Sequence, residues 1–488
     1  MAGDSEHLDV LVVGAGLSGV DAGYHLLKRC PSLSFAIVEA GDAIGGTWRL
    51  FRYPGIRSDS DPHTLGFPFR PWPEPSSVAD GGAIRAYIED TARAFGIDRH
   101  IRLGHRVTEA SWSTAEARWT VTVETAGRRR QLTCGFLFMC AGYFDYETGY
   151  EPTFPGRDQY QGVWIHPQHW PEGLDHAGKR VVVIGSGATA VTVVPAIART
   201  AAHVTMLQRS PSYVVSRPTR DGFAASLFSV LPARMAAGLV RWKNILTGSF
   251  TFWLSRRRPA LVRRAILKGV ARQLPDGAHH FTPSYAVWDQ RVCLAPDGDL
   301  FAAINDGRVE IVTDTIDRVT PTGLNLRSGR EIAADIIVSA TGLTVKLMGG
   351  VRMIVDGVPT APAGGMVYKG MMIGGIPNFA FALGYTNASW TLKCDLVSRY
   401  VCRLLNRMHR RGETMCLPVP PGVDVEPRPL IDFSSGYIKR AEAHVPKQGS
   451  RAPWRLRQNY ALDLLSLGFG RLEDGVMTFS ATKGKEKS

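Results

Sequence analysis

Short apolar runs that end in glycine-rich turns are the clearest pattern in the chain. Asp9–Val13 (DVLVV) and Lys179–Ile184 (KRVVVI) are rich in valine, which is typical of strands buried on both faces of a parallel sheet. Each is followed by a segment with helical spacing and then by a second apolar run, at Phe35–Val38 and His203–Leu207. Two such strand–helix–strand units predict an α/β fold with two Rossmann-like dinucleotide-binding domains.

The first unit carries Gly14-Ala-Gly16-Leu-Ser18-Gly19 directly after its strand. In this pattern the first glycine permits a tight turn, the second lets the backbone approach a pyrophosphate, and the third allows helix and strand to pack closely. Glu39 ends the second strand, where a carboxylate accepts the hydroxyls of an adenosine ribose and repels a 2′-phosphate. An ordinary glycine loop is the alternative, but strand, helix and acid together favour FAD or NAD over NADP.

A segment poor in regular periodicity follows this unit. It contains Gly46-Thr47-Trp48 and then Tyr53–Asp59 (YPGIRSD), whose glycines and proline predict a loop. A surface turn would explain these residues equally well. Because the segment carries Trp, Tyr, Arg and Asp directly after a nucleotide unit, we expect Gly46, Thr47, Trp48 and Asp59 to lie against a flavin.

The second unit differs from the first where the ribose would bind. Its turn supplies candidate contacts to a pyrophosphate: Gly185, Gly187, Thr189 and Ala190. Its second strand runs into Gln208, Arg209 and Ser210, at the place where the first unit has Glu39. An arginine there can bind a 2′-phosphate through charge-assisted hydrogen bonds, so we expect NADPH rather than NADH. An arginine that only extends its stem along a strand end is the alternative.

The net charge of +13 is concentrated in one stretch. Residues 222–275 contain ten Lys and Arg side chains and no Asp or Glu, interleaved with apolar residues, which predicts amphipathic helices. Three interpretations remain open: a helical insertion with a solvated basic face, peripheral docking on an anionic membrane, and nucleic-acid binding. No recognition motif accompanies the charge, so we expect no nucleic-acid partner.

Other features of composition bear on the compartment. The acidic first ten residues do not resemble a signal peptide, and the longest apolar run, residues 181–198, fits a strand–turn–helix better than a membrane span. The seven cysteines form no CxxC pair and no metal-ligand spacing, so we expect reduced thiols, no metal site and a cytoplasmic enzyme. We expect the tail Lys483–Ser488 to be disordered.

The stretch between the two units carries a family motif. Tyr160–Pro171 (YQGVWIHPQHWP) matches the linker fingerprint FxGxxxHxxxW followed by Pro or Asp, with Tyr in place of the first Phe. With a nucleotide turn on each side, the chain resembles the class B flavoprotein monooxygenases of the Baeyer–Villiger type over nearly its full length. In that family the linker histidine, here His166, orients the domains rather than acting as an acid or base.

The resemblance implies a reaction in two halves. NADPH reduces FAD, dioxygen then adds at flavin C4a, and the peroxyflavin inserts oxygen into a ketone to give an ester or lactone, or oxygenates a sulfide or thioamide. It also implies that Arg291 stabilises the peroxyflavin and the oxyanion of the adduct, while Asp59 holds that arginine near the flavin. Asn387 and Trp390 are implied to approach the flavin. Without the family match, a surface salt bridge would explain Arg291.

These expectations assemble into one domain plan. The FAD domain takes residues 1–150 and 377–488, the linker and NADPH domain take 151–214 and 301–376, and a helical insertion takes 215–300. A flavin disulfide reductase and a noncatalytic, membrane-associated flavin redox sensor remain as alternatives; a reductase would need a redox-active cysteine pair. The substrate and the oligomeric state cannot be read from the sequence.

Overall fold

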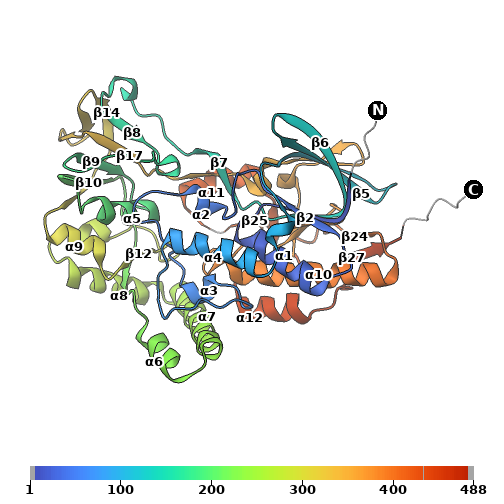
Figure 1. The fold of residues 1–488 in the computed structure, drawn as a ribbon. Coiled ribbons are helices and arrows are strands. Elements are labelled where there is room, and N and C mark those ends of the chain that lie inside the picture. The colour runs from blue at the N-terminus through green and yellow to red at the C-terminus, as the bar shows by residue number, and fades with distance from the viewer. Residues whose placement is uncertain (1–5, 432, 482–488) are drawn as a thin grey trace, which may run out of the picture.

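The computed structural model describes residues 6–431 and 433–481 and contains two parallel α/β units (Figure 1). The tail Lys483–Ser488, expected to be disordered, lies outside the described residues. The first unit is built on a nine-stranded sheet with the order β20-β19-β4-β5-β6-β1-β2-β3, in which β23 also pairs with β6. Its strands are β1 His7–Val13, β2 Phe35–Val38, β3 Ile101–Arg102, β4 Arg106–Ser113, β5 Arg118–Thr125, β6 Arg128–Met139, β19 Arg352–Val355, β20 Val358–Pro359 and β23 Phe379–Phe381.

Strand β1 explains how this sheet is covered on both faces. It pairs in parallel with β2 and β6, and its side chains alternate between two cores. Val10 and Val12 face the core that contains α1 Leu17–Arg29, α4 Gly81–Ala94 and α10 Trp390–Arg411. Leu11 and Val13 face the opposite core, which contains the tryptophans of β4 and β5. Because both faces are buried from Val10 to Val13, this part of the strand is entirely apolar, as the sequence pattern predicts.

Distant parts of the chain complete this first unit. Strand β23 adds to β6 in parallel, and α10 lies against α1 over much of its length. Helix α10 ends at Gly412, which adopts a left-handed φ of +62° that favours glycine. Smaller hairpins and helices complete the C-terminal part: β21 Val367–Tyr368, β22 Met372–Ile373, β24 Met415–Pro418, β25 Pro427–Pro429, α11 Gly436–Ala441, β26 Lys447–Gly449, α12 Tyr460–Asp463 with the π-helical turn Leu464–Phe469, and β27 Met477–Ser480.

The second unit has a five-stranded, all-parallel sheet with the order β13-β10-β9-β17-β8. Its strands are β8 Val163–Ile165, β9 Arg180–Ile184, β10 His203–Gln208, β13 Val309–Thr313 and β17 Ile336–Ser339. One face packs against α5 Ala188–Ile197 and α9 Asp299–Asn305. The other packs against a small sheet of β14 Ile316–Thr320, β15 Gly323–Leu326 and β16 Glu331–Ala333. The linker motif therefore supplies an edge strand, β8, to this sheet.

The two crossings between the units lie side by side. Strand β7 Phe144–Gly149 leaves the first unit, β18 Leu343–Val345 returns to it, and the two pair antiparallel. The backbone N–H of Tyr150 donates to the carbonyl of Gly342 at 3.1 Å. The turn Ala340-Thr341-Gly342 after β17 is thus joined to the residue that follows β7.

Three helices form an extension between the units: α6 Gly222–Val230, α7 Ala233–Arg257 and α8 Pro259–Gln273. A two-stranded parallel ribbon, β11 Val214–Arg217 with β12 Cys293–Pro296, closes its base. Helix α7 packs on the short helix α3 Pro62–Leu65, and α6 projects from the body (Figure 1). Among the described residues, no helix is both long and apolar enough to cross a membrane.

Candidate functional site

A cavity of about 850 Å³ lies at the carboxyl ends of the first unit's parallel strands. This is the edge where open α/β sheets bind nucleotides, and the volume suits a bound cofactor. The predicted residues that line it are Gly14, Gly16, Ser18, Glu39, Gly46, Thr47, Trp48, Asp59, Arg291 and Trp390. Gly19 lies behind the wall, and His166, Asn387 and the whole second glycine turn lie outside the lining.

The first glycine turn is shaped by close backbone approach. Gly14 has a φ of +105°, and a Cβ on Gly19 would lie 1.8 Å from the carbonyl oxygen of Gly14. Gly16 faces Gly46, so two bare backbone segments meet at the cavity wall. Gly14 and Gly19 therefore require glycine, as the sequence predicts, and the bare backbone at Gly16 leaves the amino end of α1 open to a phosphate.

Glu39 is fixed by the turn that it follows. Its Oε2 accepts from the backbone N–H of Ala15 at 2.7 Å, and its Oε1 accepts from that of Gly41 at 2.8 Å. A carboxylate has about four acceptor sites, so each oxygen keeps a lone pair for a ribose hydroxyl. The geometry fits the ribose of FAD at this position.

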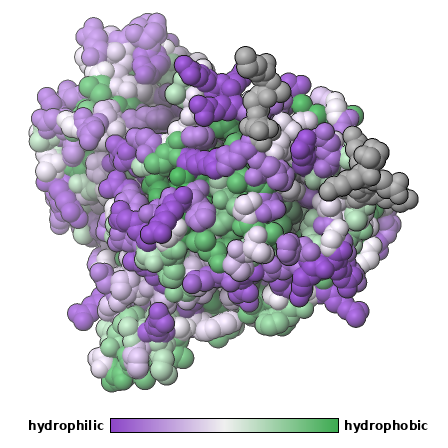
Figure 2. Space-filling model, turned by 45° about the vertical axis from the view of Figure 1, so that its right-hand side comes forward, coloured by the Kyte–Doolittle hydropathy of each residue, from purple (hydrophilic) through white to green (hydrophobic). Residues whose placement is uncertain are grey.

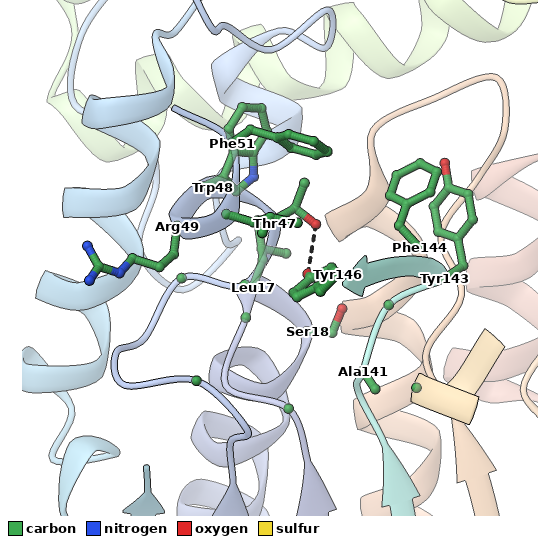
Figure 3. A pocket seen from close by; sticks show the side chains of 18 of the residues that line it. Leu17, Ser18, Thr47, Trp48, Arg49, Phe51, Ala141, Tyr143, Phe144 and Tyr146 are labelled. Carbon is green, nitrogen blue, oxygen red and sulfur yellow. Dashed lines mark hydrogen bonds between the residues drawn. The ribbon is translucent and has the colours of Figure 1, made fainter. Parts of the chain in front are cut away.

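The loop after the first unit closes the opposite wall. Gly46 precedes the single-turn helix α2 Thr47–Leu50, and the hydroxyls of Thr47 and Tyr146 are hydrogen-bonded at 3.0 Å (Figure 3). Burial raises the pKa of Tyr146 to about 12, so its phenol stays protonated. Sequence reasoning missed Tyr146, although it stands on β7, directly after the Cys140-Ala-Gly142 turn.

Arg291 and Asp59 both project into this cavity. Their exposed surface faces the cavity, while protein atoms surround both groups. Arg291 Nη2 donates to the hydroxyl of Tyr143 at 3.5 Å; Tyr143, then Tyr437 and Asp59, raise the pKa of Arg291 above its ordinary value. Burial raises the pKa of Asp59, although Arg291 and Arg57 oppose that effect. The guanidinium is therefore a permanent cation in the cavity.

Asp59, expected to hold Arg291 near the flavin, lies in the same cavity without a direct ion pair to it. Among the described residues, no ion pair within 4.0 Å joins them, and the nearest recorded hydrogen-bond partner of Arg291 is a phenol. Asp59 acts on the arginine through longer-range attraction. Tyr143 and Tyr437 are the neighbours that sequence reasoning missed. Tyr143 had a local signal because it follows the end of β6, whereas Tyr437 is brought in only by the tertiary fold.

A chain of contacts joins Arg291 to the first glycine turn. The indole N–H of Trp390 donates to Ser18 Oγ at 2.9 Å, and the indole stacks on the ring of Tyr143 with centroids 5.1 Å apart and planes at 12°. Tyr143 in turn accepts from Arg291. Asn387, the other residue expected near the flavin, instead donates to the carbonyl of Gln458 at 3.0 Å.

The second glycine turn also depends on a close backbone approach, and it lies outside the cavity lining. Gly185 has a φ of +140°, and a Cβ there would lie 2.4 Å from the carbonyl oxygen of Ala340. Its neighbours at the start of α5 are Gly187, Thr189 and Ala190. Arg209 and Ser210 are exposed beyond the end of β10 and are free to contact a ligand there.

Gln208 does not fit the expected cofactor contact. Its side chain is buried and its amide donates to the carbonyl of His280 at 2.7 Å and to Thr313 Oγ1 at 2.9 Å. The amide therefore holds the strand end against the neighbouring segments.

His166 ties the linker to the returning crossing. Its Nε2 lies 3.0 Å from the carbonyl oxygen of Gly342, and its Nδ1 accepts from the backbone N–H of Gln168 at 3.2 Å. These contacts require a neutral ring with the proton on Nε2, and burial lowers the pKa of His166 accordingly. The ring is an anchor between segments, while Gln168 and Trp170 of the same motif reach the cavity lining.

The loop Tyr53–Asp59 also bridges the two units. Arg57 Nη1 donates to Asp299 of α9 at 2.6 Å, and its Nη2 donates to the carbonyl of Leu294. Gly55 fits tightly against α5, since a Cβ there would lie 2.9 Å from the carbonyl oxygen of Thr192. The segment that lines the cavity is thus clamped to the second unit.

Comparisons with known proteins agree with this arrangement. Residues 8–347 match the family model described as flavin-binding monooxygenase-like. The FAD-containing monooxygenase EthA of Mycobacterium tuberculosis (strain ATCC 25618 / H37Rv) is 54% identical over 480 residues, 98% of each chain. The probable FAD-binding monooxygenase AlmA of Acinetobacter baylyi is 45% identical over 479 residues, 97% of this chain and 96% of the relative.

A solved structure has the same fold. The structure of oxidized steroid monooxygenase bound to NADP superposes with a TM-score of 0.76 at 24% identity and covers 97% of this chain and 99% of that one. The predicted α/β fold with two Rossmann-like domains and the predicted class of flavin-dependent monooxygenase are confirmed. The chain belongs to the flavin-binding monooxygenase-like family.

Proposed function

We propose that the chain is a Baeyer–Villiger monooxygenase that uses FAD, NADPH and dioxygen to insert one oxygen atom into ketones and to oxygenate sulfides and thioamides. One oxygen atom enters the product, the other leaves as water, and NADPH supplies the two electrons. The observation that carries the proposal is a permanently charged Arg291 in the same cavity as the FAD-type glycine turn. The similarity to a FAD-containing monooxygenase over 98% of the chain supports it.

FAD fits the residues of the cavity. The amino end of α1 at Gly16 would hold its pyrophosphate, Glu39 its adenosine ribose, and the Gly46–Trp48 loop its opposite side. When bound, the isoalloxazine supplies the hydride acceptance and oxygen activation that side chains cannot supply. At the second turn, the exposed Arg209 would bind the 2′-phosphate of NADPH.

The protein's own contribution is charge and position. Arg291 can stabilise negative charge on the oxygen of a substrate carbonyl as it becomes tetrahedral, because its guanidinium stays protonated. Tyr143 and Trp390 connect that guanidinium to Ser18 and so fix its position relative to the glycine turn. Asp59 adds a nearby negative charge that keeps the cation in the cavity.

The disulfide reductase alternative is poorly supported. All seven cysteines are buried, free thiols, and Cys140 is the one among the described residues that lines the cavity. Burial raises the pKa of Cys140 well above its ordinary value, so the nucleophilic thiolate is disfavoured.

We also propose that the enzyme is cytoplasmic and associates peripherally with the inner face of the membrane through its basic helices, residues 222–275. The concentration of cations there supports the association. A noncatalytic flavin sensor would share this location, and oxygenation activity separates the two.

The test is oxygenation by purified protein loaded with FAD. With NADPH and a panel of linear, cyclic and aromatic ketones and thioethers, mass detection with ¹⁸O₂ should find one labelled atom in the product. Arg291→Ala should retain FAD and its reduction by NADPH while product formation falls at least 100-fold. Arg327→Ala, at an exposed arginine far from the cavity lining, is the matched control. Normal oxygenation by Arg291→Ala would remove the proposed role of the arginine.

A further inference from the structure

Helix α7 carries an apolar stripe on its solvent face. Its members are 44% to 61% exposed and recur at intervals of three and four residues, which places them along one side of the helix: Met235, Leu239, Trp242, Leu246, Phe250 and Trp253. A helix at the surface of a soluble protein normally turns this kind of stripe toward the core. Here the core side is filled instead by Ala236, Val240 and Ile245.

The stripe continues onto the C-terminal segment. The rings of Trp242 and Tyr460 meet edge to face with centroids 5.8 Å apart, which places α12 beside α7. From there Leu462, Leu465 and Phe469 are 43%, 62% and 72% exposed, and their spacing of three and four residues again selects one face. We call the α7 stripe and these three residues together the apolar surface. A continuous apolar area of this kind marks an interaction site.

The projecting end of the extension adds to it. On α6, Phe223 and Val230 are 50% and 75% exposed. Figure 2 shows a lobe at the lower left of the molecule that is coloured mostly as hydrophobic, where α6 projects in Figure 1. The lobe therefore offers apolar side chains at the outermost point of the extension.

The charges on α6, α7 and α8 have one sign. Four of the ten cations in residues 222–275 have protein partners: Arg241, Lys243, Arg256 and Arg263. Within the described ranges, the other six are exposed and their side chains form no ion pair or hydrogen bond: Arg234, Arg257, Arg258, Arg264, Lys268 and Arg272. Arg257 and Arg258 stand where the α7 stripe ends, and the last three lie on one face of α8 with Leu261.

The apolar stripe and the unpaired cations together indicate which partner binds the apolar surface. A second copy of the chain would cover the stripe but would bring two sets of six free cations toward each other. Nucleic acid would match the charge but leave the apolar surface in water. An anionic bilayer matches both, because its interface accepts Trp, Phe and Leu side chains while its headgroups neutralise Arg and Lys.

We propose that the apolar surface inserts into the interface of an anionic lipid bilayer, with the basic face of α8 against the headgroups. The proposal rests on the peripheral association proposed above and specifies it: α7 and the 462–469 segment make the apolar contact, and α8 makes the electrostatic one. The segment also leads toward the cavity, since Tyr385 of the cavity lining donates to Asp463 at 2.8 Å.

Vesicle flotation of the FAD-loaded protein tests this directly. The protein should float with vesicles of equal phosphatidylglycerol and phosphatidylcholine at low salt, float less at 1 M salt, and stay at the bottom with pure phosphatidylcholine. Each cation near the surface contributes about fivefold to partitioning. The triple variant Arg264→Gln, Lys268→Gln, Arg272→Gln should therefore bind about 100-fold more weakly. The double variant Phe250→Glu, Trp253→Glu should abolish binding even at low salt.

Matched controls separate docking from general charge and from catalysis. Arg128→Gln, Arg130→Gln and Arg327→Gln remove the same charge from exposed sites elsewhere and should leave binding within about twofold. All variants should oxygenate a water-soluble ketone at the parent rate, so loss of activity in the parent protein would count against the proposed reaction and not against docking. Absence of flotation at low salt, equal loss in the control, or a dimer that Phe250→Glu, Trp253→Glu converts to monomer would overturn the proposal.

Discussion

Trp390 offers a sharp test of how the cavity positions its arginine. Its indole donates to Ser18 at 2.9 Å and stacks on Tyr143, whose hydroxyl accepts from Arg291 at 3.5 Å. A neutral hydrogen bond contributes about 1 kcal/mol and an aromatic stack about 1 kcal/mol more. Trp390→Phe loses only the first, whereas Trp390→Leu loses both.

These values set the expected rates. If the contacts act by orienting Arg291, Trp390→Phe should lower product formation about fivefold and Trp390→Leu about 30-fold. Tyr143→Phe should cost about twofold, because a hydrogen bond of 3.5 Å lies at the weak end of the range. The assay measures the rate of product formation at saturating NADPH, with FAD content checked by absorbance and FAD added to saturation.

The decisive comparison is a double-mutant cycle. In an Arg291→Ala background, Trp390→Leu should change product formation by less than about twofold, because the group that it positions is gone. A full 30-fold loss in that background would show that Trp390 acts independently of Arg291. An unchanged rate of product formation in Trp390→Leu alone would refute the chain of contacts altogether.

Three further changes test the contact between the units, the second nucleotide site and a buried carboxylate of the first unit. Arg57→Ala removes the 2.6 Å contact to Asp299 and should lower the free energy of unfolding by about 2 kcal/mol, measured by urea denaturation. Asp299→Ala should lower it by a similar amount, and the double variant should lose little more than either single variant. Additive losses in the double variant would contradict a shared contact. Arg209→Ala should raise the KM for NADPH at least tenfold more than the KM for NADH, and equal effects would remove the 2′-phosphate assignment. Burial raises the pKa of Asp21 to about 7, against about 4 in the unfolded chain. Between these pH values the folded state keeps a proton that the unfolded state has lost. The free energy of unfolding therefore falls as pH rises from about 4 to about 7. Asp21→Asn should therefore raise the melting temperature more at pH 8 than at pH 5, and an equal rise at both would refute the assignment.

Local geometry explains which parts of the site the sequence predicts. A Cβ at Gly19 would collide with the backbone of Gly14, so the turn can be recognised from residues that lie close together in the sequence. Glu39 follows for the same reason, because it contacts the backbone of Ala15 across adjacent parallel strands. Constraints of this kind act within one strand–helix–strand unit.

Contacts between distant segments explain the rest. Tyr437 meets Arg291 only because the C-terminal part folds back over the first unit, and no spacing in the sequence encodes that approach. Gln208 is turned inward by partners on His280 and Thr313, which belong to the segments packed beside β10. The sequence places such residues at a strand end, whereas the direction of the side chain depends on what the neighbouring segment offers.

The positions of the two tyrosines also bear on how a substrate reaches Arg291. A second pocket beside the cavity is lined by Tyr143, Arg291, Trp390 and Tyr437, but it holds only about 10 Å³, which is barely room for one water molecule. This pocket therefore has no room for a substrate with the side chains in this arrangement. Arg291 follows the helical extension of the second unit, whereas Tyr143 and Trp390 belong to the first, and the Arg57–Asp299 contact clamps one unit to the other. The cation and its two aromatic neighbours therefore come from different units, so the position of Arg291 in the cavity depends on how firmly the two units are held together.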